Sequence, residues 1–370
     1  MYKLKDNEQE ARERLWAFWK QKSIGRPALG VYAKNKDFEW QEWKGEPLPR
    51  KEFDLHPEWQ ANDCRNRLFA NKYLAEATPC VCMDYGRTLP LLAVLAGGDY
   101  DYDDISPWKQ PYGGTTFLLP WIRPSEGALD WNIPKFDPEH ETVKGLERNL
   151  TKIVETIGGY GFVSPPSMLD ALTTLSMLHT PDELCISLYE EPDKVKRWAY
   201  DATTLYIDCY EHFYRYLGNL GMTDTSTWLQ LLSESRMEAV QCDFSVMLSP
   251  DMFEEFVMPD MKRVTSYLDN AVWHHDGVEQ FRFIDMIASL PKVRAIQWVF
   301  AKREHPSEHI ECFKRLKDLG LSLYASMKSV DEAVYLTKTL GSDGLMMTLP
   351  LFEDEKDAYA AITEIEKAAR

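Results

Sequence analysis

Short apolar runs alternate with longer segments of helical period along most of this chain, from residue 79 onward. The longer segments carry apolar residues at the 3.6-residue spacing of amphipathic helices, and several begin at Ser, Asp or Pro and end at Gly or Asn. Eight apolar runs are typical of buried strands: residues 80–84, 160–164, 221–225, 240–247, 271–275, 295–299, 321–326 and 343–349. Such alternation favours parallel strands with helical crossovers, and we predict an α/β fold, a (β/α)8 TIM barrel.

Two stretches depart from this alternation. Residues 28–57 are rich in Trp, Pro and Gly, which suggests an irregular cap, so we expect residues 1–78 to form a helical and irregular N-terminal cap segment. Residues 97–138 contain several acidic residues and prolines and are typical of a long lid-like insertion. We therefore expect residues 79–370 to form the barrel, and the whole chain to be one structural domain.

Charge and hydropathy narrow the classes of partner. The 370 residues carry a formal net charge of −17, spread along the chain, which repels phosphate backbones and anionic lipid. No apolar run approaches the roughly 18 residues that span a bilayer, and the first residues mix charges in an amphipathic pattern unlike a signal peptide. We expect a cytoplasmic protein that binds neither nucleic acid nor membrane, with a homodimer left open.

Cysteine usage and short motifs exclude several kinds of site. The seven cysteines are scattered, which favours reduced thiols, and the one close pair, Cys80 and Cys82, is typical of small apolar residues in a core strand. The sequence contains no zinc-finger spacing, no glycine-rich nucleotide loop and no zinc-protease or serine-hydrolase motif.

The candidate chemistry lies where apolar runs stop, because barrel enzymes place their active groups at the carboxyl ends of the strands. His274 and Asp276 are two residues apart at such an end, so both side chains point the same way and could share a metal ion or a proton. The alternative is a polar strand end whose histidine caps a loop by hydrogen bonds. His275 alternates to the other side of the strand and is kept as a candidate catalytic residue.

Two further carboxylates are candidate catalytic residues. Asp243 stands between apolar neighbours, where a carboxylate is costly to bury without a partner; alternatively it holds the next loop or caps the next helix. Asp84 could act as an acid or base and Arg87 as a clamp for an anion, although the same residues also suit a salt bridge or a plain turn. The candidate substrate-binding residues are Arg87, as the clamp for an anion, and three residues that the strand-end rule selects, Trp298, Gln297 and Ser164.

Three segments resemble the uroporphyrinogen decarboxylase superfamily. Residues 243–277 contain a helix of the pattern "LSPDMFEEFVMPDMK" followed by a strand that ends in His and Gly, and this block is the most specific part of the resemblance. Residues 161–177 are similar to the family's Gly-Phe strand and following helix, and residues 330–347 to its closing helix and strand. The resemblance covers about residues 79–349. It implies an eight-stranded parallel barrel.

The family catalyses two kinds of reaction, and this sequence matches the residues required for each of them only in part. The cofactor-free decarboxylases of haem synthesis begin with an arginine-rich stretch that binds substrate carboxylates; Arg26 and Pro27 match its opening, but the arginines expected after it are missing. The methyltransferases take a methyl group from a corrinoid carrier protein and pass it to a zinc-bound thiol, with a His-x-Cys pair and a distant Cys as zinc ligands. Here His274 matches the histidine, Asp276 occupies the first cysteine position, and residues 343–349 contain no cysteine.

The resemblance therefore favours a methyltransferase-like enzyme that acts with a corrinoid protein on a small molecule. In this hypothesis His274 and Asp276 hold zinc or another divalent metal, and Asp243 orients them or acts as the base. One alternative is a metal-independent lyase or decarboxylase on a small acid, with Asp243 or Asp276 as proton donor and Arg87 binding a carboxylate. Another is a non-catalytic barrel that docks a corrinoid or other partner.

Overall fold

Parallel strands form the centre of the structure, a computed structural model that describes residues 2–46, 50–83, 89–102, 108–109, 116–117, 120–123, 132–301 and 303–370. Within these residues the largest sheet has seven strands in the order β2-β1-β13-β12-β11-β10-β9, and only the β1–β2 pair is antiparallel. The strands are β1 (Ala28–Lys34), β2 (Asn71–Ala75), β9 (Met237–Val240), β10 (Asn270–Asp276), β11 (Val293–Val299), β12 (Ser322–Ser326) and β13 (Leu345–Thr348). The fold is α/β with a mostly parallel sheet.

Shorter strands pair outside this sheet. β3 (Cys80–Val81) and β8 (Phe162–Val163) form a separate parallel pair. β4 (Asp99–Tyr102) pairs with β7 (Pro120–Arg123), and β5 (Trp108–Lys109) pairs with β6 (Thr116–Phe117), both antiparallel. These last two pairs fall in the stretch expected to be a lid, and most of its other residues between 103 and 131 lie outside the described part of the chain.

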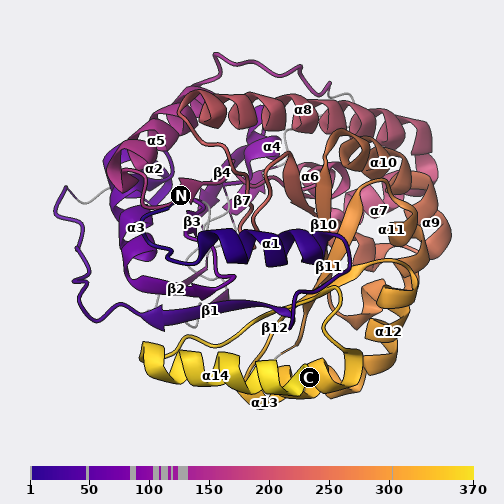
Figure 1. Ribbon diagram of the computed structural model, residues 1–370. Coiled ribbons are helices and arrows are strands. Elements are labelled where there is room, and N and C mark those ends of the chain that lie inside the picture. The colour runs from indigo at the N-terminus through magenta and orange to yellow at the C-terminus, as the bar shows by residue number, and fades with distance from the viewer. Residues whose placement is uncertain are drawn as a thin grey trace.

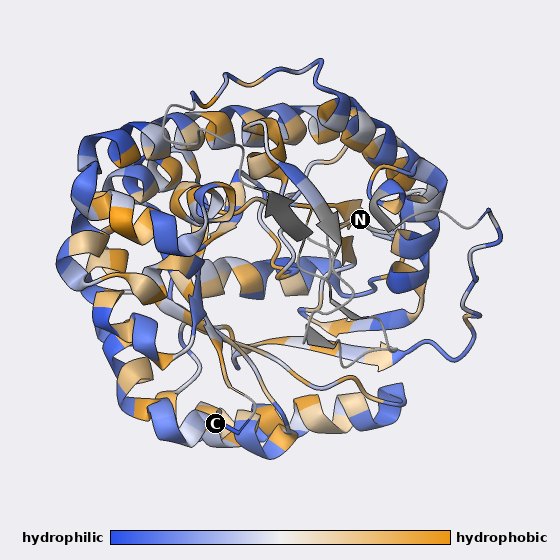
Figure 2. Ribbon diagram, turned by 180° about the vertical axis from the view of Figure 1, so that it is seen from behind, coloured by the Kyte–Doolittle hydropathy of each residue, from blue (hydrophilic) through white to orange (hydrophobic). Residues whose placement is uncertain are grey.

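Helices surround the strands, as Figure 1 shows. Their surfaces mix apolar and hydrophilic positions in Figure 2, as expected for helices that cover a core on one side and meet water on the other. The α-helices are α1 (Glu8–Trp19), α2 (Arg50–Phe53), α3 (Pro57–Phe69), α4 (Leu91–Leu95), α5 (Glu141–Ile157), α6 (Ala171–His179), α7 (Pro181–Glu190), α8 (Pro192–Asn219), α9 (Pro250–Phe256), α10 (Met258–Tyr267), α11 (Ile284–Ser289), α12 (Ile310–Asp318), α13 (Val330–Leu340) and α14 (Glu355–Ala368). The 3-10 helices are η2 (Asp243–Met247), η3 (Val278–Phe283) and η4 (Pro306–His309). No helix in the described residues is long and apolar enough to cross a membrane.

The sheet has two faces with different cores. The inner face carries Val272, Ala295 and Met346, which belong to one apolar cluster with Leu15 and Phe18 of α1. The outer face carries the alternate strand residues, such as Trp273, Ile296 and Met347, which pack in a larger cluster with the surrounding helices. The two-residue period of each strand therefore decides which side chains point to the inside of the molecule.

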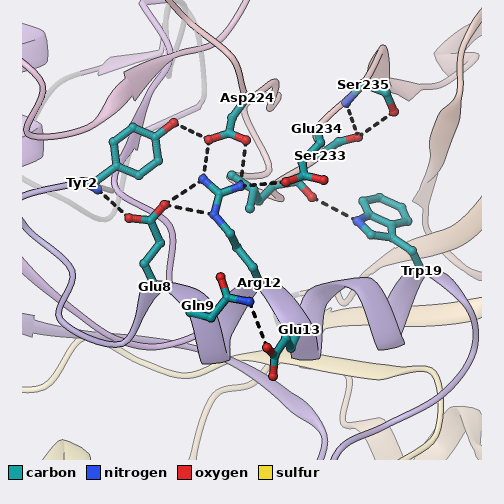
Figure 3. A network of polar contacts seen from close by, with 11 residues as sticks. Tyr2, Glu8, Gln9, Arg12, Glu13, Trp19, Asp224, Ser233, Glu234 and Ser235 are labelled. Carbon is teal, nitrogen blue, oxygen red and sulfur yellow. Dashed lines mark hydrogen bonds and ion pairs between the residues drawn. The ribbon is translucent and has the colours of Figure 1, made fainter.

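Helix α1 is fixed to the inner side by an ion-pair network (Figure 3). The Arg12 guanidinium donates to both carboxylate oxygens of Asp224, over 2.8 and 2.5 Å, and to Glu8. The Tyr2 hydroxyl also donates to Asp224. This network joins the first helix to the segment before β9, more than 200 residues later.

Three expectations from the sequence were wrong in detail. Residues 28–34 are not part of an irregular cap: they form β1, which pairs with both β13 and β2. Residues 221–225 form no strand, and Thr225 makes only an isolated bridge with Ser233. The strand expected over residues 240–247 ends at Val240, because the chain turns there into η2.

Candidate functional site

The inner face becomes polar toward the carboxyl ends of β10, β11 and β12. Along β10, apolar Val272 is followed on the same face by His274 and then Asp276. The register pairs His274 with Gln297 of β11, and Gln297 with Tyr324 of β12. The strand ends therefore bring an imidazole, an amide and a phenol together above an apolar floor.

His274 is held in one orientation by two neighbours. Its Nδ1 is hydrogen-bonded to Gln297 Oε1. Because a carbonyl oxygen can only accept, Nδ1 carries a proton in this pair, which leaves Nε2 as the ring nitrogen that Gln297 does not engage. The Trp228 ring packs edge-on against the imidazole, with 4.9 Å between ring centroids. His274 is therefore arranged to accept a proton or to bind a ligand through Nε2.

Asp243 interacts electrostatically with His274 and Asp276, the two polar residues at the carboxyl end of β10. It lies half-buried at the start of η2, directly after β9. Burial raises the pKa of its carboxyl, the nearby His274 lowers it, and the negative charge of Asp276 raises it, with a net rise. The Gln241 amide lies 3.5 Å from Asp243 Oδ2. Asp243 thus keeps its proton to higher pH than an ordinary aspartate, as a proton donor requires.

A second polar row closes the inner side next to His274. The Tyr324 hydroxyl donates to the carbonyl of Leu229 over 3.2 Å and lies 2.9 Å from Thr348 Oγ1. The Tyr32 hydroxyl donates to Gln230 Oε1 over 2.8 Å. Sequence reasoning missed Tyr32 because β1 was not recognised, and missed Trp228 and Gln230 because they belong to no strand. The one feature of the sequence that could have indicated this loop is residues 228–232, a mostly apolar run without a regular helical or strand period.

His275 and Trp298 lie on the outer face, away from the side chains of His274 and Gln297. His275 is fully buried, and its ring stacks on Trp298 with centroids 4.5 Å apart. Burial lowers the pKa of His275 to about 3, with smaller contributions from His274 and His309. Neither ring nitrogen has a hydrogen-bond partner in the described part of the chain. The surroundings of His275 and Trp298 are those of a packed core.

Of the remaining residues singled out from the sequence, Ser164 and Arg26 fall within the described part of the chain. Asp84 and Arg87 lie outside the described residues. Ser164 is fully buried after β8, and its hydroxyl has no hydrogen-bond partner in the described ranges. Arg26, which matched the opening of the decarboxylase pattern, is buried at the start of β1 and pairs with Glu76 over 2.5 and 3.0 Å. Its guanidinium is used by that ion pair and is not free for a substrate carboxylate.

Whether a zinc ion fits beside His274 depends on how many ligand side chains surround it. Protein zinc sites use three or four ligands, drawn from Cys, His, Asp and Glu. The described residues contain no group of three or more such side chains placed to hold a metal. Within those residues, no third such side chain is placed together with His274 and Asp276.

Comparison with known proteins adds no assignment. No protein-family model matches this chain, and no curated protein matches it.

Proposed function

We propose that this chain is a methyltransferase-like enzyme, in which Asp243 donates a proton to the leaving atom of a small methylated compound. The observation that supports the proposal is the raised pKa of Asp243 beside His274 at the carboxyl edge of the parallel sheet. The resemblance of residues 243–277 to the corrinoid-dependent branch of the uroporphyrinogen decarboxylase superfamily supports methyl transfer as the reaction. The methyl group would pass to or from a corrinoid carried by a separate protein.

The charges at the site favour methyl transfer over decarboxylation of a small acid. Besides burial, the groups that act on Asp243 are the imidazole of His274 and the carboxylate of Asp276. A second carboxylate repels an anionic substrate but accommodates a neutral or cationic one.

The chemical step requires two contributions from this chain, a proton donor and a group that positions the substrate. The methyl group would pass to the reduced corrinoid of the partner protein, which supplies the electron pair of the new bond to carbon. The electrons of the broken bond to nitrogen, oxygen or sulfur stay on that leaving atom. A proton from the Asp243 carboxyl neutralises the charge there, which leaves Asp243 as a carboxylate. His274 accepts a hydrogen bond from the substrate at Nε2 and fixes it beside Asp243, while Gln297 keeps the imidazole in the required tautomer.

The proposal includes a complete eight-stranded barrel as the framework of the site. Six neighbouring strands, β1 and β13 through β9, run parallel, with the first strand of the series beside the last. The separate parallel pair of β3 and β8 would supply the remaining two strands. Both features support a closed barrel, in which the carboxyl edge is the catalytic face.

An exposed apolar rim supports the corrinoid protein as a partner. Val246 and Met247 lie three and four residues after Asp243 and are each about half exposed, and Val278 lies two residues after Asp276. Arg282 Nη2 donates to the carbonyls of Ser245, Val246 and Leu248, so this segment is held in place. A fixed apolar rim beside the site is suited to contact with a second protein.

The test is a methyl-transfer assay in which free cob(I)alamin stands in for the corrinoid protein. The full-length chain is mixed with a panel of methylated amines, ethers and thioethers, and the loss of cob(I)alamin absorbance is followed. We expect transfer from at least one class of compound, and a loss of 100-fold or more in Asp243→Asn, the usual size of a general-acid contribution.

Asp208→Asn is the matched control, because it removes an exposed carboxylate from the outer helix α8. It should keep the rate of the unchanged chain. Transfer that survives Asp243→Asn at full rate would contradict the role of Asp243, and no transfer from any class would contradict methyl transfer itself.

A further inference from the structure

The 3-10 helix η3 lies beside the two segments that carry the acidic residues of the candidate site. It follows β10 after Gly277, whose φ of 89° is readily adopted only by glycine and lets the chain turn back. The other segment is η2, which begins at Asp243 and packs next to η3. A side chain of η3 can therefore reach both the end of β10 and the residues around Asp243.

Gln280 of η3 makes this connection through both ends of its amide. Its Oε1 accepts from the main-chain N–H of Asp276 over 3.2 Å. Its Nε2 donates to Ser245 Oγ over 3.2 Å and lies 3.5 Å from the carbonyl oxygen of Cys242. Cys242 precedes Asp243 and Ser245 follows it by two residues. One amide thus links the chain on both sides of Asp243 to the end of β10.

Gln280 is itself fixed by its surroundings. Its side chain is buried, with 1% exposed. The nearby Phe283 stacks face to face on Phe253 of α9, with 4.2 Å between ring centroids. Arg282 holds the outer side of η2 by hydrogen bonds to carbonyls within residues 245–248. A buried amide that is hydrogen-bonded at both ends is costly to move, because a displaced donor or acceptor loses its partner away from water.

We propose that Gln280 is a positioning residue, which keeps the carboxyl of Asp243 at a fixed place relative to His274. The inference rests on the proposed function, in which Asp243 donates a proton and His274 holds the substrate. Gln297 fixes the His274 ring from β11, and Gln280 fixes the chain around Asp243 from η3. Since a misplacement of about 1 Å can cost on the order of 100-fold in rate, this connection determines how well the proton reaches the leaving atom.

The first measurement needs no substrate. Gln280→Met keeps the approximate length of the side chain and loses its hydrogen bonds, and amide hydrogen exchange of the full chain is followed by NMR. We expect the Asp276 N–H to exchange at least about tenfold faster than in the unchanged chain, because its acceptor is gone.

Gln60→Met is the matched control for this variant. Gln60 of α3 is also buried, and its amide donates to the carbonyl of Phe53 over 3.0 Å. Figure 1 shows α3 on the opposite side of the molecule from α11, the helix that follows η3. The control therefore loses a similar buried amide and should leave both the exchange of the Asp276 N–H and the rate of methyl transfer unchanged.

The second measurement is the dependence of the methyl-transfer rate on the leaving atom. A misplaced proton donor slows compounds whose leaving atom is strongly basic, such as alkyl methyl ethers, more than aryl methyl ethers, whose phenolate leaves more readily without a proton. We expect Gln280→Met to lose about tenfold or more in rate with the alkyl member of the reacting class and less than about threefold with the aryl member. Ser245→Ala removes one of the contacts of Gln280 and should show the same split with a smaller loss.

The outcomes separate a failure of this inference from a failure of methyl transfer. An Asp276 N–H that exchanges in Gln280→Met as slowly as in the unchanged chain would overturn the role of Gln280, whatever the rates are. Equal losses with alkyl and aryl compounds would also overturn it, because a chain that is only less stable loses the same factor with both. No transfer by the unchanged chain would instead contradict the proposed function and remove the reaction that Gln280 is proposed to assist.

Discussion

His274 and His275 are neighbours in one strand and have opposite environments. His274 lies on the inner face with an amide on Nδ1 and Asp243 and Asp276 nearby. His275 lies on the outer face between aromatic rings, with a pKa lowered to about 3. Because side chains alternate along a strand, the first histidine lies at the candidate site and the second lies in the core.

The largest expected effect of this difference is on stability in acid. The pKa of His275 is about 3 in the folded chain, against an ordinary value of 6.5. Between these values the unfolded chain binds a proton that the folded chain does not, so stability present above pH 6.5 is lost as the pH falls toward 3. The loss amounts to about 3 kcal/mol between pH 6.5 and pH 4, and we expect His275→Leu to remove it, as measured by denaturant unfolding at both pH values.

His274→Leu is the control for this prediction. It should keep the acid dependence of the unchanged chain, because His275 is still present. Equal slopes of stability against pH in the two leucine variants would contradict the assignment of His275 to the core.

The next effect concerns the orientation of His274. Gln297→Leu removes the acceptor for Nδ1, so the imidazole can rotate and change tautomer. We expect a drop of about tenfold in the initial rate of the cob(I)alamin assay, within the range known for partners that orient a catalytic histidine. Gln297→Glu, which keeps an oxygen acceptor, should recover most of the rate. A Leu variant as fast as the unchanged chain would show that Gln297 has no such role.

A smaller effect is expected at Asp276. Its charge raises the pKa of Asp243, so Asp276→Asn should lower the pH at which Asp243 titrates, by less than about one unit because Asp276 is exposed to solvent. Carboxyl 13C NMR measures the shift. Asp285→Asn, which removes a carboxylate paired with Arg315, should leave the titration unchanged. A rise in the Asp276 variant would contradict the stated cause.

Much of the sheet could be predicted because its strands are strongly apolar and closely spaced. Residues 271–275, 295–299, 321–326 and 343–349 all contain or overlap observed strands. β1 was missed because its seven residues are followed by a stretch that contains several Trp and Pro residues, which hides the strand pattern. Residues 221–225 were overpredicted because their apolar and polar residues alternate without a neighbouring strand to pair along their length.

The site was predictable only in part, for a physical reason. The period of a strand places His274 and Asp276 on one face and His275 on the other, and this agrees with the structure. The partners of His274 come from another strand and a loop, Gln297 and Trp228, and strand register and loop paths are long-range properties.

The most direct test of the central claim compares the two histidines in the methyl-transfer assay. His274→Leu, His275→Leu and the unchanged chain are assayed side by side at pH 7 with the same methylated compound. We expect the rate of methyl transfer to fall 100-fold or more in His274→Leu and to stay nearly unchanged in His275→Leu. An active His274→Leu beside an inactive but folded His275→Leu would contradict it.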